Sequence, residues 1–511
     1  MQITSETISS PYPSDAAELT QLLFKRDHEI AALKHELSVL KRMLFGQKSE
    51  KLVTPPAEQM RLEGLFESSA PEPGFAEDKE TITYERRKKK KGHGRNAIPD
   101  DLYCEEIILE PSESEKRCAC CGKDKKCIGH EETKILEYKP AVLYAKKYIR
   151  PKYVCSDCPD QGVTTALLPS RPIEKGVAGT GLLAYLLISK YVDHLPLYRL
   201  EQIFKRYNVH INRSTMVGWI AQVCEYLQLI YDTMQSELIK STYLQSDETP
   251  LKVQDKNKER KCHHGYLWPY TDGKMILFEY CQSRNRGGPT TFLKDFSGYL
   301  QTDDYAGYNE IAAKSDVTRL LCWAHARRKF VEVKDIDPEY VEKVLLHIGK
   351  LYAVEKYCRE QKLPPAERYK VRQIDVPTYL QELKAVLENP GNTILPKSPV
   401  ASAISYTLSN WEMLTRYLDD GRLEIDNNRI ENAIRPVALG RKNWLFAGSH
   451  DGAERLAILY SIFGTCKMNT INPYEYIKDV LDRIMDYPRH KIKDLTPLEW
   501  KKARQKSDDM G

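Results

Sequence analysis

The first pattern along the chain is a seam of apolar residues within residues 15–48, spaced alternately by three and four positions. Its members are Leu19, Leu23, Ile30, Leu33, Leu37, Leu40 and Leu44. A polar residue, Arg26, interrupts the seam once, and charged residues flank it. This spacing predicts a coiled-coil helix. Because a narrow seam needs a partner, we expect homo-oligomers to form through it. A single helix docked on the chain's own body is the alternative interpretation.

A second helical pattern occupies residues 161–240. Its apolar face is broken near Pro196 and again at residues 208–210, after which a new helix is expected. This arrangement resembles a helix-turn-helix, in which Arg213 would face DNA. Plain packing of helices explains the same pattern equally well.

From Ser241 the apolar residues alternate with polar ones, which predicts strands. Five strands are expected, in STYLQSDETPLKV, HGYLWPYTD, KMILFEYCQS, GYLQTDD and TRLLC. Helices are expected after the third, the fourth and the fifth. This order is that of a ribonuclease-H-like fold, a mixed sheet with helices on both faces. We assign this catalytic core to residues 241–330 and 415–450.

Residues 331–414 separate the two parts of this core. They have helical spacing and many charges, with breaks at residues 364–365 and 390–399, and they have the length of an insertion. Residues 451–511 are expected to form further helices that end in a basic tail. The chain is therefore predicted to be a multidomain α/β protein.

Composition argues against a membrane protein and a secreted protein. The 511 residues are 41% hydrophobic with a mean hydropathy of −0.54. No apolar run approaches the ~18 residues of a membrane-spanning helix. The first residues lack the basic start and apolar core of a secretory signal. We expect a cytoplasmic protein without membrane contact.

Residues 49–115 are predicted to be a linker, because residues 54–80 are rich in Pro, Glu, Ala and Ser, which is typical of a flexible segment. A basic run in this segment includes Lys88, Lys89 and Lys90. Such a run can bind DNA phosphates through the release of counterions, or it can simply be solvated. The net charge of +5 is too small to favour either interpretation.

Four of the 13 cysteines form two Cys-x-x-Cys pairs within residues 116–160. The pairs are Cys118 with Cys121 and Cys155 with Cys158. A hairpin is predicted between them, over residues 134–149. Four thiolates close a tetrahedral Zn²⁺ site and leave no open position for catalysis. A structural zinc module is predicted, in which Cys120, Cys127 or His130 could replace one ligand. Buried thiols without metal are the alternative.

Three acids stand where they could bind divalent metal ions. Asp247 ends the first predicted strand, Asp303 ends the fourth, and Glu431 lies in a helix after the fifth. Acids at the ends of adjacent strands can share two ions that activate the attacking oxygen and stabilise the leaving oxygen in phosphoryl transfer. Aspartates at strand ends are also common caps and turn formers. Glu431 alone could form a surface ion pair with Arg435.

Glu431 lies in a polar and basic segment, LEIDNNRIENAIRPVALGRKNWLFAGS. Asp426 is expected to cap the helix that begins there, and Pro436 is expected to kink or end it. The side chains that suit contact with DNA are Arg327, Arg328, Arg435, Arg441, Lys442 and Trp444. Trp444 could equally belong to the core.

Together these motifs resemble the DDE transposases of the bacterial insertion-sequence-66 type. Beside the coiled coil and the cysteine pairs, the resemblance rests on FGQKSEK, SDETPLKV, LQTDDYAGY, CWAHARRKF, DNNRIENAIRPVALGRKNWLFAGS and NPYEYI. It implies that Asp247, Asp303 and Glu431 bind two Mg²⁺ ions. Asp304 stands where the family often has glycine, so Asp303 or Asp304 would face the metals. His325, in the Cys-x-x-His motif, would hold the scissile phosphate or a metal-bound acid, or have a structural role.

The resemblance implies a bacterial enzyme that works at the nucleoid. It would cleave DNA at the terminal inverted repeats of an insertion sequence and transfer the freed strand to target DNA. Its partners would be both DNAs, further copies of the chain and small helper proteins of the same element. The insertion would be all-helical. A nuclease of the same fold that does not join ends, and an inactive zinc-bearing DNA-binding regulator, are the alternative functions.

Overall fold

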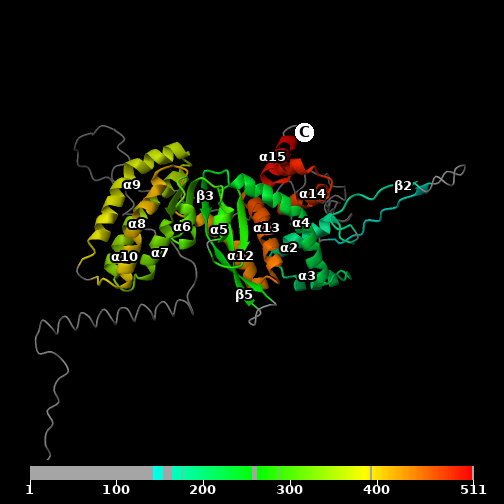
Figure 1. Ribbon diagram of the computed structural model, residues 1–511, viewed down its shortest axis with the longest axis horizontal. Coiled ribbons are helices and arrows are strands. Elements are labelled where there is room, and N and C mark those ends of the chain that lie inside the picture. The colour runs from blue at the N-terminus through cyan, green and yellow to red at the C-terminus, as the bar shows by residue number, and fades with distance from the viewer. Residues whose placement is uncertain are drawn as a thin grey trace, which may run out of the picture. The chain divides into compact units, whose positions relative to one another are not determined.

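A computed structural model of the chain describes residues 142–153, 164–174, 176–255, 262–285, 287–391 and 394–508 (Figure 1). The predicted coiled coil, the basic run and the four cysteines of the predicted zinc module lie outside these residues. The chain divides into two compact units. One is Leu62–Ala166, and the other combines Met1–Arg61 with Leu167–Gly511.

In the smaller unit the described residues contain one antiparallel pair of short strands, β1 (Lys152–Tyr153) and β2 (Thr164–Thr165). The two strands flank the segment that carries the second cysteine pair. Of the hairpin predicted over residues 134–149, only residues 142–149 belong to the described part of the chain, and they have no regular secondary structure. The strand pair in the described residues therefore has one strand before the second cysteine pair and one after it, whereas the predicted hairpin precedes that pair.

The larger unit is built on a six-stranded mixed sheet. Its strands are β3 (Tyr243–Ser246), β4 (Thr249–Gln254), β5 (Cys262–Thr271), β6 (Ile276–Cys281), β7 (Gly298–Thr302) and β8 (Val317–Leu321). The order is β4-β5-β3-β7-β8, and β6 pairs with β5. The strands β3, β7 and β8 are parallel, and β5 is antiparallel to its three partners.

The strands β3 and β4 form one interrupted strand. Ser246 pairs with Tyr270 of β5, and Thr249 pairs with Leu267, so the same register resumes after two residues. As expected, β3 ends directly before the acidic pair, but the chain then resumes the same pairing as β4, which the sequence did not indicate. The strand loses its parallel neighbour β7 at this point but keeps its antiparallel neighbour β5, which continues the pairing.

One group of helices shares a hydrophobic core with the sheet. Its members are α2 (Thr180–Tyr191), α3 (Leu197–Lys205), α4 (Arg213–Leu238), α13 (His450–Met468), α14 (Pro473–Arg483) and α15 (Pro497–Asp508). Helix α4 follows α3 after a short turn, as in a helix-turn-helix. Its long apolar side, from Met216 to Leu238, is nevertheless buried in the core. Its first three residues, Arg213 to Thr215, are exposed, as those of a recognition helix would be.

Helix α13 covers the free edge of β6. The Ser461 hydroxyl accepts a hydrogen bond from the Phe278 N–H at 2.8 Å, and the Thr465 hydroxyl accepts one from the Ile276 N–H at 3.1 Å. From α4, the Tyr231 hydroxyl donates to the Phe278 carbonyl at 3.0 Å. An uncovered edge strand is a site for pairing with other chains. These side chains therefore close the sheet on this side.

A second group of helices lies between β8 and the Glu431 helix and has its own hydrophobic core. Its members are α7 (Trp323–Glu332), α8 (Pro338–Glu360), α9 (Pro365–Glu388), α10 (Pro399–Ser409) and α11 (Trp411–Thr415). Helices α8, α9 and α10 each begin with a proline, whose missing N–H costs nothing in the first turn. Between α7 and the Glu431 helix the described residues form helices and no strands, as expected.

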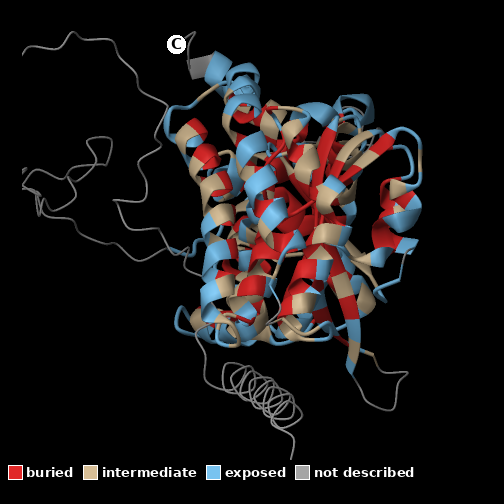
Figure 2. Ribbon diagram, turned by 90° about the vertical axis from the view of Figure 1, so that its left-hand side faces the viewer, coloured by how far each residue is buried: buried red, intermediate tan, exposed pale blue. Residues whose placement is uncertain are grey.

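The remaining elements are short, apart from the Glu431 helix α12 (Asn428–Trp444). They are α5 (Gly287–Phe292), η3 (Ala306–Tyr308), α6 (Asn309–Ala312), η4 (Arg416–Leu418) and η5 (Arg489–Leu495). Figure 2 shows the buried residues concentrated on the sheet and on the helix faces turned toward it. The sheet therefore carries the core, and its carboxyl edge carries the predicted acids.

Candidate active site

Asp247 and Asp303 lie side by side at the carboxyl edge of two parallel strands. In the register of β3 and β7, Gln245 is opposite Gln301. Two residues further along, the same register places Asp247 opposite Asp303. Neighbouring strands are about 4.8 Å apart. The sheet alone therefore brings together two of the three predicted acids.

The same two strands position the segment that leads into α12. The Gln245 side-chain amide donates to the Asp426 carbonyl at 3.0 Å, and the Gln301 amide donates to the Glu424 carbonyl at 2.9 Å. Both glutamines are buried. Because side chains alternate along a strand, residues two positions apart face the same side. Asp247 and Asp303 thus share a face of the sheet with the segment that carries the third acid.

Glu431 enters this edge from the first turn of α12. Asp426 accepts hydrogen bonds from the Asn428 N–H at 3.2 Å and from its side-chain amide at 2.7 Å, so it satisfies a donor of the first turn from one residue before the N-cap. The helix continues through Pro436 to Trp444, so of the two expected effects of the proline, a kink or an end, it does not end the helix. Glu431 faces Arg328 of α7 at 3.5 Å.

Cys322 connects the end of β8 to the start of α12. Its thiol donates to the Asn427 side-chain oxygen at 2.9 Å and accepts from the Asn427 N–H at 3.3 Å. Both residues are fully buried. The cysteine of the Cys-x-x-His motif therefore joins two parts of the site, and three residues later His325 lines the pocket beside Asp303.

The acids repel one another. The pKa of Asp247 is raised to about 7, first by burial and then by the charges of Glu248, Asp303 and Glu431. Burial and the charge of Asp303 also raise the pKa of Glu248. Such shifts are typical of sites that bind a cation or move protons. The repulsion places all four carboxylates within one electrostatic neighbourhood.

Glu248 and Arg284 form a pair that the sequence analysis did not single out. The Glu248 side chain is 8% exposed, and its Oε1 accepts from the Arg284 Nε at 2.8 Å. Its Oε2 is buried and has no hydrogen-bond partner. The Arg284 guanidinium lies over the Tyr305 ring, 4.1 Å from its centre. The only sequence signal was the position of Glu248 directly after Asp247.

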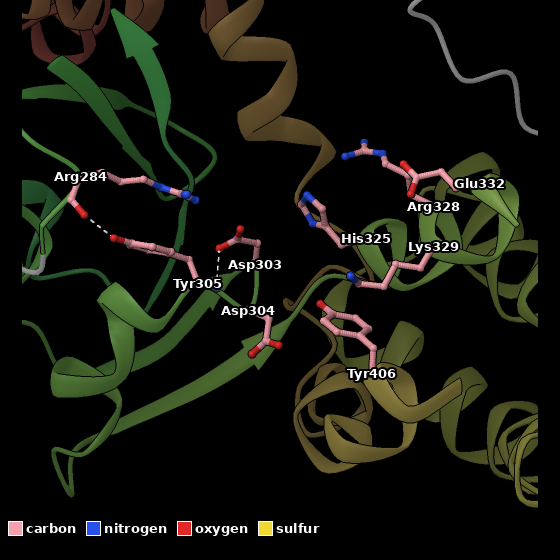
Figure 3. Close-up of a pocket in the computed structure, with 9 residues that line it drawn as sticks. All are labelled: Arg284, Asp303, Asp304, Tyr305, His325, Arg328, Lys329, Glu332 and Tyr406. Carbon is pink, nitrogen blue, oxygen red and sulfur yellow. Dashed lines mark hydrogen bonds between the residues drawn. The ribbon is translucent and has the colours of Figure 1, made fainter. Parts of the chain in front are cut away.

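A pocket of about 400 Å³ opens beside Asp303 (Figure 3). It is lined by Arg284, Asp303, Asp304, Tyr305, His325, Arg328, Lys329, Glu332 and Tyr406. Figure 3 shows the carboxylates of Asp303 and Asp304 pointing in opposite directions. Asp303 accepts from the Tyr305 N–H at 3.0 Å, whereas Asp304 accepts from the Asn410 amide at 3.0 Å. This geometry favours Asp303 over Asp304 as the acid beside Asp247.

Within the described ranges, no three side chains of His, Cys, Asp or Glu are close enough together to hold one metal ion. The third acid, Glu431, is instead in contact with Arg328. A cation that used all three acids would therefore require the Glu431 side chain to leave Arg328.

The residues predicted to contact DNA occupy different environments. Arg435 and Lys442 are exposed on α12, and Arg213 is exposed at the start of α4, 3.3 Å from Glu201. Arg327 is buried, so its neighbour Arg328 is the one that faces the pocket.

Two further residues near the end of α12 face the protein more than solvent. The Arg441 guanidinium donates to the Pro250 carbonyl, and burial lowers the pKa of Arg441. The Trp444 side chain is half-buried and packs against the core. Of the two roles considered for Trp444, this placement favours a core residue.

The mixed sheet, the helical insertion and the acids at the carboxyl edge define a ribonuclease-H-like protein. Comparison with known families is more specific, because the Transposase IS66 family, a DDE family, matches residues 175–455, more than half of the chain. The chain belongs to the IS66 family of transposases.

Matches to further family regions cover other parts of the chain. A leucine-zipper region, described as Transposase C of IS166 homeodomain, matches residues 32–107. The zinc-finger binding domain of transposase IS66 matches residues 115–159, and the IS66 C-terminal element matches residues 461–498. These matches confirm the predicted presence of a leucine zipper and a zinc-finger domain. The family implies DNA binding and a divalent metal, and the zinc-finger domain implies zinc.

Similar proteins occur in Sinorhizobium fredii (strain NBRC 101917 / NGR234). The uncharacterized protein y4jD is 32% identical over 96% of this chain and 97% of its own length. The uncharacterized proteins y4hP and y4qI are 30% and 31% identical, over 93% and 96% of this chain and 89% and 92% of their own lengths. In the described part of this chain no helix is long and apolar enough to cross a membrane.

Proposed function

We propose that this chain is a Mg²⁺-dependent DNA transposase that cleaves DNA at the ends of an insertion sequence and joins the freed strand to target DNA. One observation carries the proposal. The register of β3 and β7 sets Asp247 beside Asp303, on the face of the sheet crossed by the segment that leads to Glu431.

The acids suit a divalent cation. Asp247 is repelled by three neighbouring carboxylates, and Glu248 has a buried oxygen without a partner. Asp247, Asp303 and Glu431 would hold two Mg²⁺ ions, which when bound activate the attacking oxygen and stabilise the leaving oxygen. The carboxylates themselves form no covalent bond to DNA.

The two arginines that pair with the acids would also contact DNA. Arg328 would exchange its contact with Glu431 for one with a phosphate, and Arg284 lines the same pocket from the opposite side. A guanidinium binds a phosphate with two parallel hydrogen bonds. His325, between them, would hold the scissile phosphate or a metal-bound acid.

Surfaces remote from the acids would position the DNA. Arg435 and Lys442 are exposed on the helix of Glu431, and Arg213 is exposed on α4. The basic run at Lys88–Lys90 and the zinc module of Cys118, Cys121, Cys155 and Cys158 would add contacts to the terminal repeats. The coiled coil at residues 15–48 would pair protomers so that two ends meet, with small helper proteins of the same element as further partners.

Paired variants of neighbouring aspartates test the proposal. Duplexes from the ends of the DNA segment that carries this gene would be incubated with protein and Mg²⁺, and nicked and joined products would be separated on gels. Asp303→Asn should lower cleavage about a thousandfold, equivalent to about 4 kcal/mol of transition-state stabilisation. Asp304→Asn, the matched control on the other side of the strand, should cleave nearly as well as the parent.

Three outcomes would replace the proposal. Cleavage without any joined product would make the protein a nuclease of the same fold. DNA binding without Mg²⁺-dependent cleavage would make it a regulator. Equal activity of Asp303→Asn and the parent would show that the acids are assigned wrongly.

A further inference from the structure

Two large apolar side chains stand in solvent where α12 ends. Leu445 is 62% exposed and Phe446 is 42% exposed. We call this pair the apolar tip. The indole of Trp444 before it packs against the core, and Ala447 after it is buried. Between two anchored neighbours, the tip is the only part of this turn that faces outward.

The backbone holds the tip rigidly. The Phe446 N–H donates to the Trp444 carbonyl at 2.8 Å, and Leu445 has φ +63° and ψ −43°, so the three residues form a γ-turn. This turn is rare and strained for a residue other than glycine. Strain of this kind persists where the surrounding structure imposes it and is concentrated at functional sites.

The residue after the tip is fixed to the sheet. The Ala447 N–H donates to the Lys252 carbonyl at 2.9 Å, and the Ala447 carbonyl accepts from the Gln254 N–H at 2.8 Å. Ala447 thereby forms a bridge with Val253 of β4. Helix α12 on one side and β4 on the other prevent the tip from folding its side chains into the core.

Two exposed basic side chains lie on α12 before the tip. Arg435 and Lys442 are exposed on α12, between Glu431 and the tip. Fourteen residues separate Glu431 from Leu445, which at 1.5 Å per residue is about 21 Å along the helix. Duplex DNA rises 3.4 Å per base pair, so this distance corresponds to about six base pairs.

We propose that the apolar tip is a wedge that enters the base stack of the bound DNA, about six base pairs from the phosphate that is cut. The inference rests on the proposed function, because it takes the cut to occur at Glu431. Apolar side chains inserted between base pairs unstack them and kink the duplex. Flanking cations bind the adjacent phosphates, which is the charge complementarity expected for DNA.

A second protein surface is a poorer occupant of this site. Stable protein interfaces bury about 800 Å² on each partner and are depleted of lysine. The tip offers two apolar side chains, and an exposed lysine, Lys442, lies three residues before Leu445 in the last turn of α12. Two apolar side chains are few for a protein interface of that area, whereas one or two are enough to enter a gap between base pairs.

Fluorescence of 2-aminopurine, which rises when the base is unstacked, tests the wedge. The probes are duplexes from the ends of the DNA segment that carries this gene, each with a single 2-aminopurine at a different position. Full-length protein with Glu431→Gln is used, so that the DNA stays intact. Binding should raise the fluorescence several-fold at one or two positions about six base pairs from the cut.

Two further variants in this background remove the wedge. Phe446→Ala and Leu445→Gly should lose most of the fluorescence rise, yet keep the DNA affinity within about threefold, because phosphate contacts dominate affinity. Leu445→Gly also serves as the folding control, since glycine adopts a positive φ without strain, and it should melt no lower than its parent. Tyr474→Ala, an aromatic residue of matched exposure (39%) on α14, should keep the full rise.

Several results would overturn the wedge. One is an unchanged fluorescence rise in both tip variants, and another is tight binding by the parent with no rise at any position. A third is a shift to smaller oligomers in the tip variants during size-exclusion chromatography, which would make the tip a subunit contact. If Asp303-dependent cleavage is normal in these cases, the wedge alone fails. If the parent protein binds the DNA but does not cleave it with Mg²⁺, the proposed function fails instead.

Discussion

Two clusters of buried or half-buried charge lie in the larger unit, and they differ in how the charges are balanced. In the insertion, Glu355 accepts hydrogen bonds from Arg368 at 3.0 Å and from Arg372 at 2.7 Å. Arg368 also donates to Glu424 at 3.0 Å, and Arg429 donates to the same carboxylate at 2.6 Å, so each acid of this cluster is neutralised by arginine. At the sheet edge, four acids share two arginines. These acids are Asp247, Glu248, Asp303 and Glu431, and the arginines are Arg284 and Arg328.

The pKa directions reveal the difference. Burial alone would raise the pKa of Glu424, but the hydrogen bond and charge of Arg368 outweigh it and the pKa lies below its usual value. Burial also raises the pKa of Asp247, and there the neighbouring charges are negative and raise it further. A balanced cluster holds helices in place, whereas an unbalanced one is suited to binding a cation.

Removing one charge from the balanced cluster should have the largest effect. Glu355→Gln leaves Arg372, which is fully buried, without a carboxylate. Breaking a buried ion pair costs about 3–5 kcal/mol. Urea unfolding followed by circular dichroism should show this loss of stability. A loss below ~1 kcal/mol would mean that the cluster is already well hydrated.

Removing one charge from the unbalanced cluster should have the opposite sign. Asp247→Asn should stabilise the metal-free protein by about 2 kcal/mol at pH 8, because it removes a repelled charge. The pKa of Asp247 is about 7 in the folded protein, above the value of the unfolded chain. The folded state therefore holds this proton more tightly, and the parent loses stability as the pH rises from about 4 to about 7.

The stabilisation by Asp247→Asn should grow over that same pH interval and then stay constant. Urea unfolding in EDTA at a series of pH values measures it. Equal stability of the parent and the variant at pH 8 would show that Asp247 is not repelled by its neighbours.

Mg²⁺ should stabilise the parent by supplying the missing positive charge. At a concentration of ten times its Kd, a ligand that binds only the folded state adds about 1.4 kcal/mol. Thermal melts with and without Mg²⁺ measure this shift, and Asp247→Asn should lose most of it. A similar shift in the parent and in Asp247→Asn would place the metal elsewhere.

An exposed ion pair provides the smallest expected effect. Glu382 pairs with Lys350 at 2.7 Å, and both side chains are more than one third exposed. Glu382→Gln should change the stability by no more than about 0.5 kcal/mol. This variant calibrates the loss measured for Glu355→Gln in the same helical insertion, and an effect of several kcal/mol would show that exposure does not separate the two pairs.

The sequence predicted the parts of the site that depend on local patterns. Alternating apolar residues located the strands, so Asp247 and Asp303 could be assigned to strand ends from their immediate neighbours. The helical insertion was also predictable, because its breaks coincide with prolines. The pattern around Asp247 did not indicate β4, since a strand that loses one neighbour can continue along the other.

The contacts that align the site could not be predicted in this way. Gln245 and Gln301 reach carbonyl groups that are 181 and 123 residues away in the chain, and no sequence pattern links either glutamine to its partner. The pairing of Glu248 with Arg284 also depends on the folded sheet. Pro436 does not end helix α12, because the helix has packing beyond the proline, where Val437 and Gly440 are buried.

The covered edge of β6 affects how the protein is made. The N–H groups of Ile276 and Phe278 donate to side chains that are 189 and 183 residues further along the chain. At ~5–20 residues per second, translation takes about 10–40 s to cover that interval. Throughout this time the nascent sheet has an open edge that other chains could join, and the third acid is also still to be synthesised or folded. A ribosome-bound chain therefore leaves this edge uncovered until α13 has been synthesised.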